Sequence, residues 1–229
     1  MSELWVCNLG QVDYAEGVAL QERVRERVQE GDLPDVMLLL EHPPVYTRGR
    51  RSDEGEIPMG EDWYRAQGID VVKTDRGGKL TYHGPGQIVG YPIMGIGDVV
   101  EYLRVMERAI IQSLADEGVE AQIRDGLTGV WVDDRKIGSI GVHVQRGVTT
   151  HGFAVNVDND LQPFEWAVAC GMPETRMTSV LRETGRTGLM PCVRKRVAYA
   201  VCQALGRRQR LISAARLFAE RPSVSATAR

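Results

Sequence analysis

The sequence predicts a single α+β domain built on a mixed, largely antiparallel sheet that is flanked by helices. Strand and helix patterns are segregated along the chain, whereas a doubly wound parallel fold alternates them regularly. The 229 residues are 43% hydrophobic and 26% charged, which is the composition of a globular domain with a sizeable core. The sequence contains neither internal repeats nor low-complexity tracts that would divide the chain.

The first part of the chain predicts two strands around a helix. Residues 4–7 are typical of a short strand, and a helix follows from Asp13, which has a glutamate three residues later as a capping partner. The apolar run 36–40 is typical of a buried strand. It ends before the proline pair at 43–44, because proline cannot donate to a sheet ladder. We expect a long polar loop there, carrying the arginines Arg48, Arg50 and Arg51.

The middle of the chain predicts short elements around glycine-rich turns. In chain order, the patterns indicate a short helix at 63–67 and then strands at 69–73, 80–83 and 87–94. A glycine-rich turn at 75–79 separates the first two of these strands. A long helix begins at Asp98, with Glu101 as its capping partner and apolar residues along one face.

The last part predicts a hairpin, two further strands and two helices. The hairpin turns at 133–134, so that Lys136 lies at the start of the returning strand. Strands around 142–144 and 153–157 extend the sheet, and a short helical stretch at 163–169 ends near Cys170. A helix at 191–205 has its apolar side chains on one face. We expect residues 1–206 to form the domain and residues 207–229 to form a basic, partly mobile extension.

Composition excludes several classes of protein. The hydrophobic runs, such as 36–40, have at most six residues, and the N-terminus lacks the order of a signal peptide, so we expect a cytoplasmic protein without a membrane span. The four cysteines are widely spaced without histidines at metal-ligand spacing, which predicts no metal site and no disulfide framework. An acidic chain with 6% aromatic residues does not favour nucleic-acid binding.

Four features are candidates for chemistry, and each has a plain structural alternative. The turn Arg76-Gly77-Gly78 binds a ligand or is simply a tight turn. His83 and His151, each followed by glycine, line a cleft or are hydrogen-bonded structural residues. Lys136 is a site residue or an exposed hairpin lysine, and Cys170 is a nucleophile or an inert buried thiol. The residues alone leave these alternatives open.

Taken together, six segments resemble the octanoyltransferases of lipoate biosynthesis, the lipoate-protein ligase B family. The matching segments are 40–49 (LEHPPVYTRG), 74–87 (TDRGGKLTYHGPGQ), 129–132 (GVWV), 136–141 (KIGSIG), 151–156 (HGFAVN) and 169–171 (ACG). The resemblance covers nearly the whole chain up to about residue 206, and the combination of motifs is highly specific.

The resemblance implies the fold of the biotin and lipoate protein ligase catalytic domains. It implies an enzyme that moves an octanoyl group from octanoyl-acyl carrier protein to a lysine of lipoyl domains, in 2-oxoacid dehydrogenase E2 subunits and the glycine cleavage H protein. It implies no cofactor, and we expect a monomer. Cys170 would form the acyl-thioester and Lys136 would lower its pKa. The pocket would be lined by Arg76, Gly77, Gly78, Lys79, Leu80, Thr81, Tyr82, His83, Ser139, Ile140, Gly141, His151, Gly152, Phe153 and Ala154.

The chain departs from the family pattern at Gly138, where alanine or cysteine is more usual, and we expect a slightly roomier or more flexible wall near Lys136. Two other functions stay open, an ATP-dependent lipoate-protein ligase on the same fold and a non-catalytic binder of carrier proteins.

Residues 182–229 hold 11 Lys and Arg against two glutamates, in a chain of net charge −3. This basic face is either solvated or docks the acidic carrier protein through Arg194, Lys195, Arg196, Arg207 and Arg208.

Overall fold

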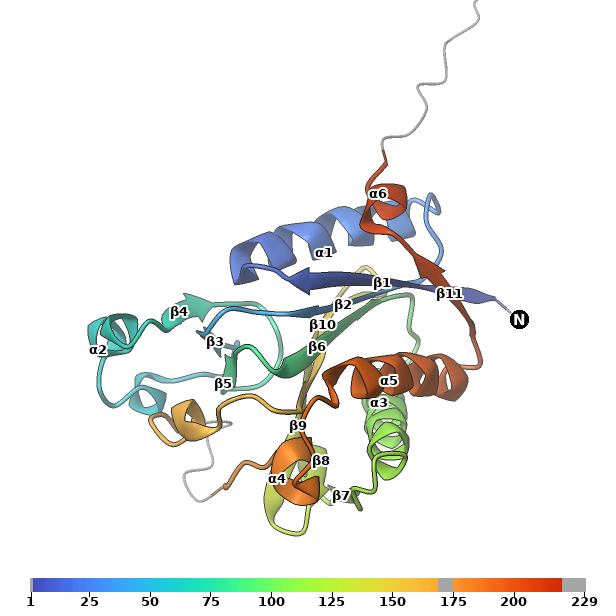
Figure 1. The fold of residues 1–229 in the computed structure, drawn as a ribbon. Coiled ribbons are helices and arrows are strands. Elements are labelled where there is room, and N and C mark those ends of the chain that lie inside the picture. Colours follow the sequence, from blue (N-terminus) through green and yellow to red (C-terminus); the bar gives the residue numbers. More distant parts are fainter. Residues whose placement is uncertain (1, 169–174, 220–229) are drawn as a thin grey trace, which may run out of the picture.

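The protein folds as two sheets of unequal size with helices on both faces of the larger one. A computed structural model describes residues 2–168 and 175–219 (Figure 1). The larger sheet has eight strands in the order β11-β1-β2-β6-β10-β9-β8-β7. Its strands are β1 (Glu3–Gln11), β2 (Val36–Glu41), β6 (Gln87–Ile93), β7 (Gln122–Arg124), β8 (Leu127–Val132), β9 (Arg135–Gln145), β10 (Val148–Asn156) and β11 (Arg208–Ile212). Among the described strands of this sheet, only the pairs β1·β11 and β1·β2 are parallel, so the predicted mixed, largely antiparallel sheet is confirmed.

Helices cover the two faces of this sheet separately. On one face lie α1 (Tyr14–Gln29) and α6 (Ala214–Leu217), and on the other lie α3 (Val99–Ala115) and α5 (Met190–Ala204) (Figure 1). Each face has its own core of buried apolar side chains: Met106, Ile110 and Val197 lie in one, and Val24 and Leu38 in the other. Strands β2, β6 and β10 are buried throughout, except for Glu41 at the end of β2. This burial explains the unbroken apolar run of β2.

A second, three-stranded sheet in the order β4-β3-β5 lies beside the first. Its strands are β3 (Val45–Arg48), β4 (Asp70–Lys73) and β5 (Leu80–His83), with β3·β4 parallel and β3·β5 antiparallel. Helix α2 (Glu61–Ala66) and the short turns η1 (Glu54–Glu56) and η2 (Gln162–Phe164) surround it, and α4 (Val180–Thr184) follows later in the chain. Aromatic side chains, among them Tyr46, Tyr64 and Tyr82, form the core of this part.

The structure corrects two expectations about local structure. The predicted polar loop after the proline pair contains β3, because the prolines separate two strands of different sheets and do not end strand structure altogether. Part of the predicted C-terminal extension belongs to the domain, since β11 pairs with β1 and Leu217 is completely buried. The expectation of mobility at the C-terminus falls on residues 220–229, which lie outside the described residues.

Helix capping follows the predicted pattern at α3 and departs from it at α1. The Asp98 side chain accepts a hydrogen bond from the Glu101 N–H at 2.7 Å, as the capping pattern predicts. Asp13 precedes α1 without such a side-chain bond.

In the two described ranges, none of the helices has the length and apolar character needed to cross a bilayer.

Candidate active site

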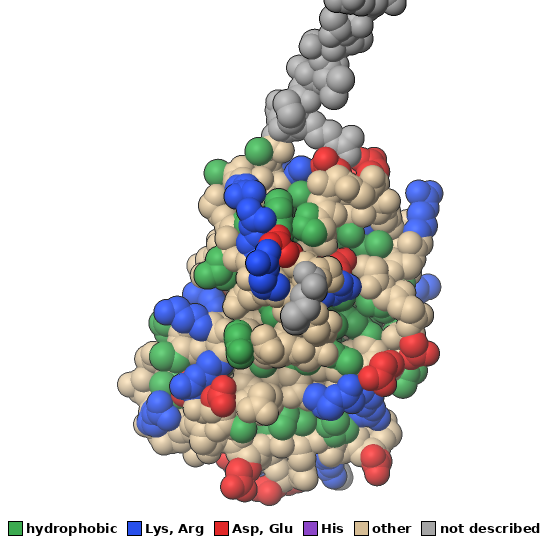
Figure 2. Space-filling model, turned by 90° about the vertical axis from the view of Figure 1, so that its right-hand side faces the viewer, with side chains coloured by type: hydrophobic (Ala, Val, Ile, Leu, Met, Phe, Trp, Pro, Cys, Tyr) green, Lys and Arg blue, Asp and Glu red, His purple; other side chains and the backbone are tan. Residues whose placement is uncertain are grey.

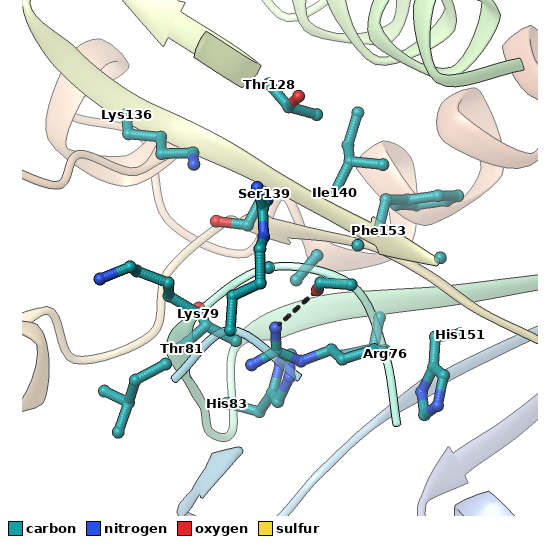
Figure 3. Close-up of a pocket in the computed structure, with 18 of the residues that line it drawn as sticks. Arg76, Lys79, Thr81, His83, Thr128, Lys136, Ser139, Ile140, His151 and Phe153 are labelled. Atoms are coloured by element: carbon teal, nitrogen blue, oxygen red, sulfur yellow. Dashed lines mark hydrogen bonds between the residues drawn. The ribbon is translucent and has the colours of Figure 1, made fainter. Parts of the chain in front are cut away.

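A cavity of about 400 Å³ lies where the two sheets meet. Strand β5 of the small sheet, strands β6, β9 and β10 of the large sheet, and the turn after β4 all contribute side chains to it. Figure 3 shows Thr128 and Lys136 on one side and Arg76, Thr81 and His83 on the other, with Ser139 between them. The volume lies within the range of small-molecule binding pockets.

The structure brings nearly all the predicted pocket residues to this one cavity. Those that line it are Arg76, Gly77, Gly78, Lys79, Leu80, Thr81, His83, Lys136, Ser139, Ile140, Gly141, His151, Gly152, Phe153 and Ala154. Side chains that the sequence analysis did not single out also line it: Tyr14, Arg51, Val89, Tyr91, Leu127 and Thr128. The alternation of β6 offers a signal for Val89 and Tyr91, since they share one face of a predicted strand.

Tyr82 is the exception among the predicted pocket residues. It does not line the cavity, and its ring packs in the small-sheet core, edge to face with Phe164 at a centroid distance of 5.4 Å. Its neighbours Thr81 and His83 do line the cavity, because successive side chains of a strand point to opposite faces. Burial raises the pKa of Tyr82 to about 12, which keeps its hydroxyl neutral. The expectation that Tyr82 is a pocket residue is therefore corrected.

Lys136 is a buried lysine at the cavity wall. It is 4% exposed, and its Nζ lies 5.4 Å from the centroid of the Trp131 ring. The hairpin between β8 and β9 positions it, and Asp133 at the turn has a φ of 52°. An exposed edge lysine would be solvated, so burial favours the interpretation of Lys136 as a site residue.

Gly129 makes room for the Lys136 side chain. Its φ is 131°, and a Cβ atom there would lie 2.5 Å from Lys136 Cε and 2.7 Å from the Gly138 carbonyl oxygen. The Gly129 N–H donates to Glu107 Oε1 at 2.9 Å, which holds this strand against α3. Glycine at this position is therefore a requirement of the lysine's placement.

Gly129→Ala is expected to lower the rate of the octanoyl transfer that the family resemblance implies at least tenfold, because the new methyl group displaces the Lys136 side chain. The left-handed φ adds strain of about 1–3 kcal/mol. Gly118→Ala is the matched control, since Gly118 also has positive φ, +81°, but nothing within 4 Å of its Cβ position. Measuring the rate and the thermal midpoint of both variants separates displacement of the lysine from strain. An equal loss of rate in both variants would contradict this role of Gly129.

The glycine-rich turn is fixed from both sides. Arg76 is buried, and its guanidinium donates to the Thr47 hydroxyl at 2.8 and 3.1 Å and to the Thr47 carbonyl. The Gly77 N–H donates to the Val142 carbonyl on β9 at 2.9 Å. A Cβ at Gly141 would lie 2.8 Å from the Gly77 carbonyl oxygen, so the turn and β9 approach as closely as glycine permits. The turn is therefore a rigid wall of the cavity.

Lys79 is paired with carboxylates. Its Nζ lies 3.1 Å from Asp53 Oδ2 and 3.4 Å from Glu56 Oε1, and these hydrogen bonds raise its pKa. Glu56 is 1% exposed and also accepts a hydrogen bond from the Leu80 N–H at 3.0 Å. The Glu56 carbonyl accepts from the Val168 N–H at 2.9 Å. Glu56 thus connects the cavity wall to the chain directly before residues 169–174.

Two buried histidines beside the cavity are held neutral. Burial lowers the pKa of His83 to about 3 and that of His42 to about 4, and the two rings lie 5.7 Å apart. His83 Nδ1 donates to Gln87 Oε1 at 2.7 Å, while His42 Nδ1 donates to the Val12 carbonyl at 2.6 Å. These bonds place the proton of each neutral ring on Nδ1. His83 is thus a neutral part of the cavity wall.

Stability is expected to fall as the pH drops below about 6.5. The unfolded histidines bind protons from that pH downwards, while the folded rings stay neutral until about pH 4 and 3. Each ring therefore removes about 1 kcal/mol of unfolding free energy per pH unit in this window. Urea unfolding at several pH values measures the slope, which His42→Gln and His83→Gln should each reduce. A slope below pH 6.5 that both variants leave unchanged would refute this assignment.

His151 connects β10 to Asp75, the first residue of the glycine-rich turn. It is 3% exposed, and its Nε2 donates to Asp75 Oδ1 at 2.7 Å. This hydrogen bond lowers the pKa of Asp75 to about 2. The backbone of His151 has a φ of 58°, and its N–H donates to Gln21 Oε1 at 2.6 Å. A non-glycine residue held in this conformation is typical of a position that the surrounding structure determines strongly.

Gly138 does not line the cavity. A Cβ there would approach Val130 at 3.2 Å and Ile110 of α3 at 3.6 Å, on the face of β9 that packs against the helix. The expectation of a roomier cavity wall is therefore wrong, since the missing side chain would lie in the α3 core.

Cys170 and its motif 169–171 lie outside the described residues. The chain on both sides of residues 169–174 is described: Val168 is bound to Glu56, and the Arg176 carbonyl accepts from the Lys136 N–H at 2.9 Å. The Thr178 N–H donates back to the Lys136 carbonyl at 3.0 Å.

Of the described cysteines, Cys7 and Cys202 are buried and Cys192 is exposed. Within the two described ranges, no group of three or more His, Cys, Asp and Glu side chains is arranged to hold a metal ion.

The mixed sheet with helices on both faces is the fold of solved lipoate protein ligase structures. The model of one family, described as "Lipoyl protein ligase A/B catalytic domain", matches residues 13–202, and the chain belongs to this family. The sequence resemblance and the predicted fold are thereby confirmed.

Relatives and solved structures agree with this membership. The chain is 47% identical over 212 residues to an octanoyltransferase of Mycobacterium tuberculosis, covering 90% of this chain and 88% of the relative. It is 46% identical over 210 residues to an octanoyltransferase of Mycolicibacterium smegmatis, covering 87% and 88%. A putative lipoate protein ligase from T. acidophilum with bound lipoic acid superposes with a TM-score of 0.74 at 18% identity, over 93% of this chain and 89% of that one. This last likeness is one of fold.

Proposed function

We propose that this protein is an octanoyltransferase, which moves the octanoyl group from octanoyl-acyl carrier protein to a lysine of a lipoyl domain through a thioester on Cys170. The observation that carries the proposal is the position of Lys136. It is buried at the cavity wall, and its backbone N–H is hydrogen-bonded to Arg176, six residues beyond Cys170 in the chain. The relatives named octanoyltransferase support the choice of acyl group.

In the first half-reaction, the Cys170 thiolate attacks the carbonyl carbon of the donor thioester. A free thiol with a pKa near 8.5 is only a few per cent ionised at pH 7, so a nearby ammonium group increases the population of the nucleophile. Lys136 supplies this charge in our proposal. The bond between the acyl carbon and the carrier sulfur breaks, and the leaving carrier thiolate takes a proton from the Lys136 ammonium. The products are the acyl-enzyme, the carrier thiol and a neutral Lys136.

In the second half-reaction, the neutral amine of the acceptor lysine attacks the Cys170 thioester. Its proton passes to Lys136, which acts as general base, and Cys170 leaves as the thiolate. Thioester-to-thioester exchange is nearly balanced in energy, and conversion of a thioester to an amide is downhill. The cycle therefore ends with the original thiolate and ammonium pair and consumes no ATP.

The cavity has the character that an acyl chain requires. Val89, Leu127, Ile140 and Phe153 supply apolar surface, and Lys136 lies at the same cavity. Figure 3 shows Ile140 and Phe153 on the side of the cavity away from Lys79. Apolar side chains in one part of the cavity and polar ones in the rest favour a ligand with an apolar chain and a reactive polar end.

The acceptors that we propose are the lipoyl domains of 2-oxoacid dehydrogenase E2 subunits and the glycine cleavage H protein. We propose that the enzyme works as a monomer in the cytoplasm and needs no cofactor. The alternative function, an ATP-dependent lipoate-protein ligase, shares the fold with the solved ligase structures. Such an enzyme activates a free acid as an acyl-adenylate and does not need a cysteine at position 170.

The test supplies each donor separately with an apo lipoyl domain and measures octanoylation by mass. We expect modification with octanoyl-acyl carrier protein in the absence of ATP, and no modification with octanoate plus ATP. Modification only with octanoate and ATP would replace our proposal with the ligase.

A further inference from the structure

Several arginines near the C-terminus are already paired with carboxylates. Arg207 lies 3.0 Å from Asp35, Arg210 lies 3.0 Å from Glu3, and Arg208 pairs with the same Glu3. In α5, Arg194 pairs with Glu41 at 2.6 Å and Arg196 with Glu117 at 2.9 Å. On the face of the molecule shown in Figure 2, Lys and Arg side chains are interspersed with Asp and Glu side chains. Docking an acidic partner here would compete with existing ion pairs.

The loop after β3 presents two arginines at the mouth of the cavity. The Arg50 N–H donates to the Arg76 carbonyl and the Arg51 N–H donates to the Gly78 carbonyl, both at 3.0 Å. Their backbones are thus fixed to the glycine-rich turn, while both residues are exposed and Arg51 also lines the cavity. Neither forms an ion pair with any carboxylate of residues 2–168 or 175–219. The nearby carboxylates of Asp53 and Glu56 are paired with Lys79.

A third exposed arginine lies close in the chain to the cavity wall. Arg124 is exposed on β7, directly before the segment 126–128 that lines the cavity. Its guanidinium carbon lies 5.0 Å from the centroid of the Trp131 ring, which orients it without neutralising its charge. Asp125 beside it is exposed, and the described side chains include no ion-pair partner for Arg124. Figure 3 shows Thr128, which follows this strand in the chain, across the cavity from Arg76.

We propose that Arg50, Arg51 and Arg124 form the docking surface for the acidic acyl carrier protein that delivers the donor thioester. This inference rests on the proposed function and moves the docking site away from the C-terminal arginines. The carrier holds its acyl group on an arm attached through a phosphodiester, and the thioester end of that arm has to enter the cavity. The phosphodiester and the acidic carrier then lie at the mouth of the cavity. Arginine guanidinium groups that have no carboxylate partner within the protein can bind phosphate and carboxylate groups there.

The experiment compares two charge-matched double variants with two donors. Arg50→Gln/Arg124→Gln, the mouth variant, removes two positive charges from the proposed docking surface, and Arg208→Gln/Arg210→Gln removes two from strand β11. We measure the rate at which each protein is acylated by octanoyl-acyl carrier protein and by octanoyl-pantetheine, which lacks both the carrier and the phosphodiester. Discharge of each acyl-enzyme to a lipoyl domain is measured separately.

We expect the mouth variant to lose about tenfold or more in kcat/KM for the carrier-bound donor at low salt, with the loss in KM. Its use of octanoyl-pantetheine should change by less than twofold, and the β11 variant should resemble the wild type with both donors. Loss in the β11 variant alone would return docking to the C-terminal arginines. An effect confined to discharge would make the mouth an acceptor site. A wild type inactive with both donors would instead overturn the proposed function.

Discussion

Cys170→Ala is expected to abolish octanoyl transfer, with a loss of about 10⁴-fold or more in rate. The proposed route passes through a covalent thioester, and alanine has no atom that can form it. The assay follows octanoylation of a lipoyl domain with octanoyl-acyl carrier protein as donor. The thermal midpoint, measured in parallel, separates lost chemistry from lost folding.

The control for this prediction is Cys192→Ala. Cys192 is exposed on α5, whereas burial raises the pKa of Cys7 and raises that of Cys202 to about 11, which makes these two thiols poor nucleophiles. The Cys192 variant should retain the wild-type rate. Transfer by the Cys170 variant at a rate comparable to the wild type would contradict a thioester route through this residue.

Lys136→Met is expected to slow acylation by about 10²–10⁴-fold at pH 7. Methionine is unbranched and apolar, so it can follow the space beside Gly129 and Trp131 that the lysine stem occupies. Without the ammonium group, the thiol has to ionise unaided, so the rate of acylation should recover as the pH rises above about 8.5. Stopped-flow measurement of acylation from pH 6 to 10 follows this recovery.

The surface lysine Lys195 supplies the matched control, as Lys195→Met removes the same charge from the exposed side of α5. It should keep the wild-type pH profile. A Lys136→Met variant whose rate is reduced equally at every pH would assign Lys136 a structural role in the cavity wall and no role in ionising the thiol.

Local patterns predicted the elements whose signals lie close together in the chain. Strand β5 has the predicted bounds, and Asp98 caps α3 as its spacing with Glu101 indicated. The hairpin that carries Lys136 was predicted from the polar turn at 133–134. In each case, the residues that specify the structure are neighbours in sequence.

Pairings between distant segments could not be predicted in the same way. Strand β11 joins the sheet through β1, about 200 residues earlier in the chain. Its arginines locally indicate a solvated extension, because their partner Glu3 lies at the other end of the sequence. Strand β3 follows a proline pair that locally indicates a loop.

The candidate site was predicted largely through the family resemblance. Sequence spacing left Lys136, His83 and His151 with structural alternatives, because burial and cavity lining depend on how two sheets meet. Tyr82 was assigned to the pocket with its neighbours, although the alternation of a strand turns it to the opposite face. Burial and, to a smaller extent, the neighbouring His42 lower the pKa of His83, and only the folded structure brings these two histidines together.

The most direct test of the central claim is the mass of the protein after incubation with octanoyl-acyl carrier protein, without ATP and without acceptor. The thioester route predicts one octanoyl adduct, located on Cys170 by peptide mapping and discharged when a lipoyl domain is added. An unmodified protein, or an adduct on another residue that the lipoyl domain does not discharge, would contradict it.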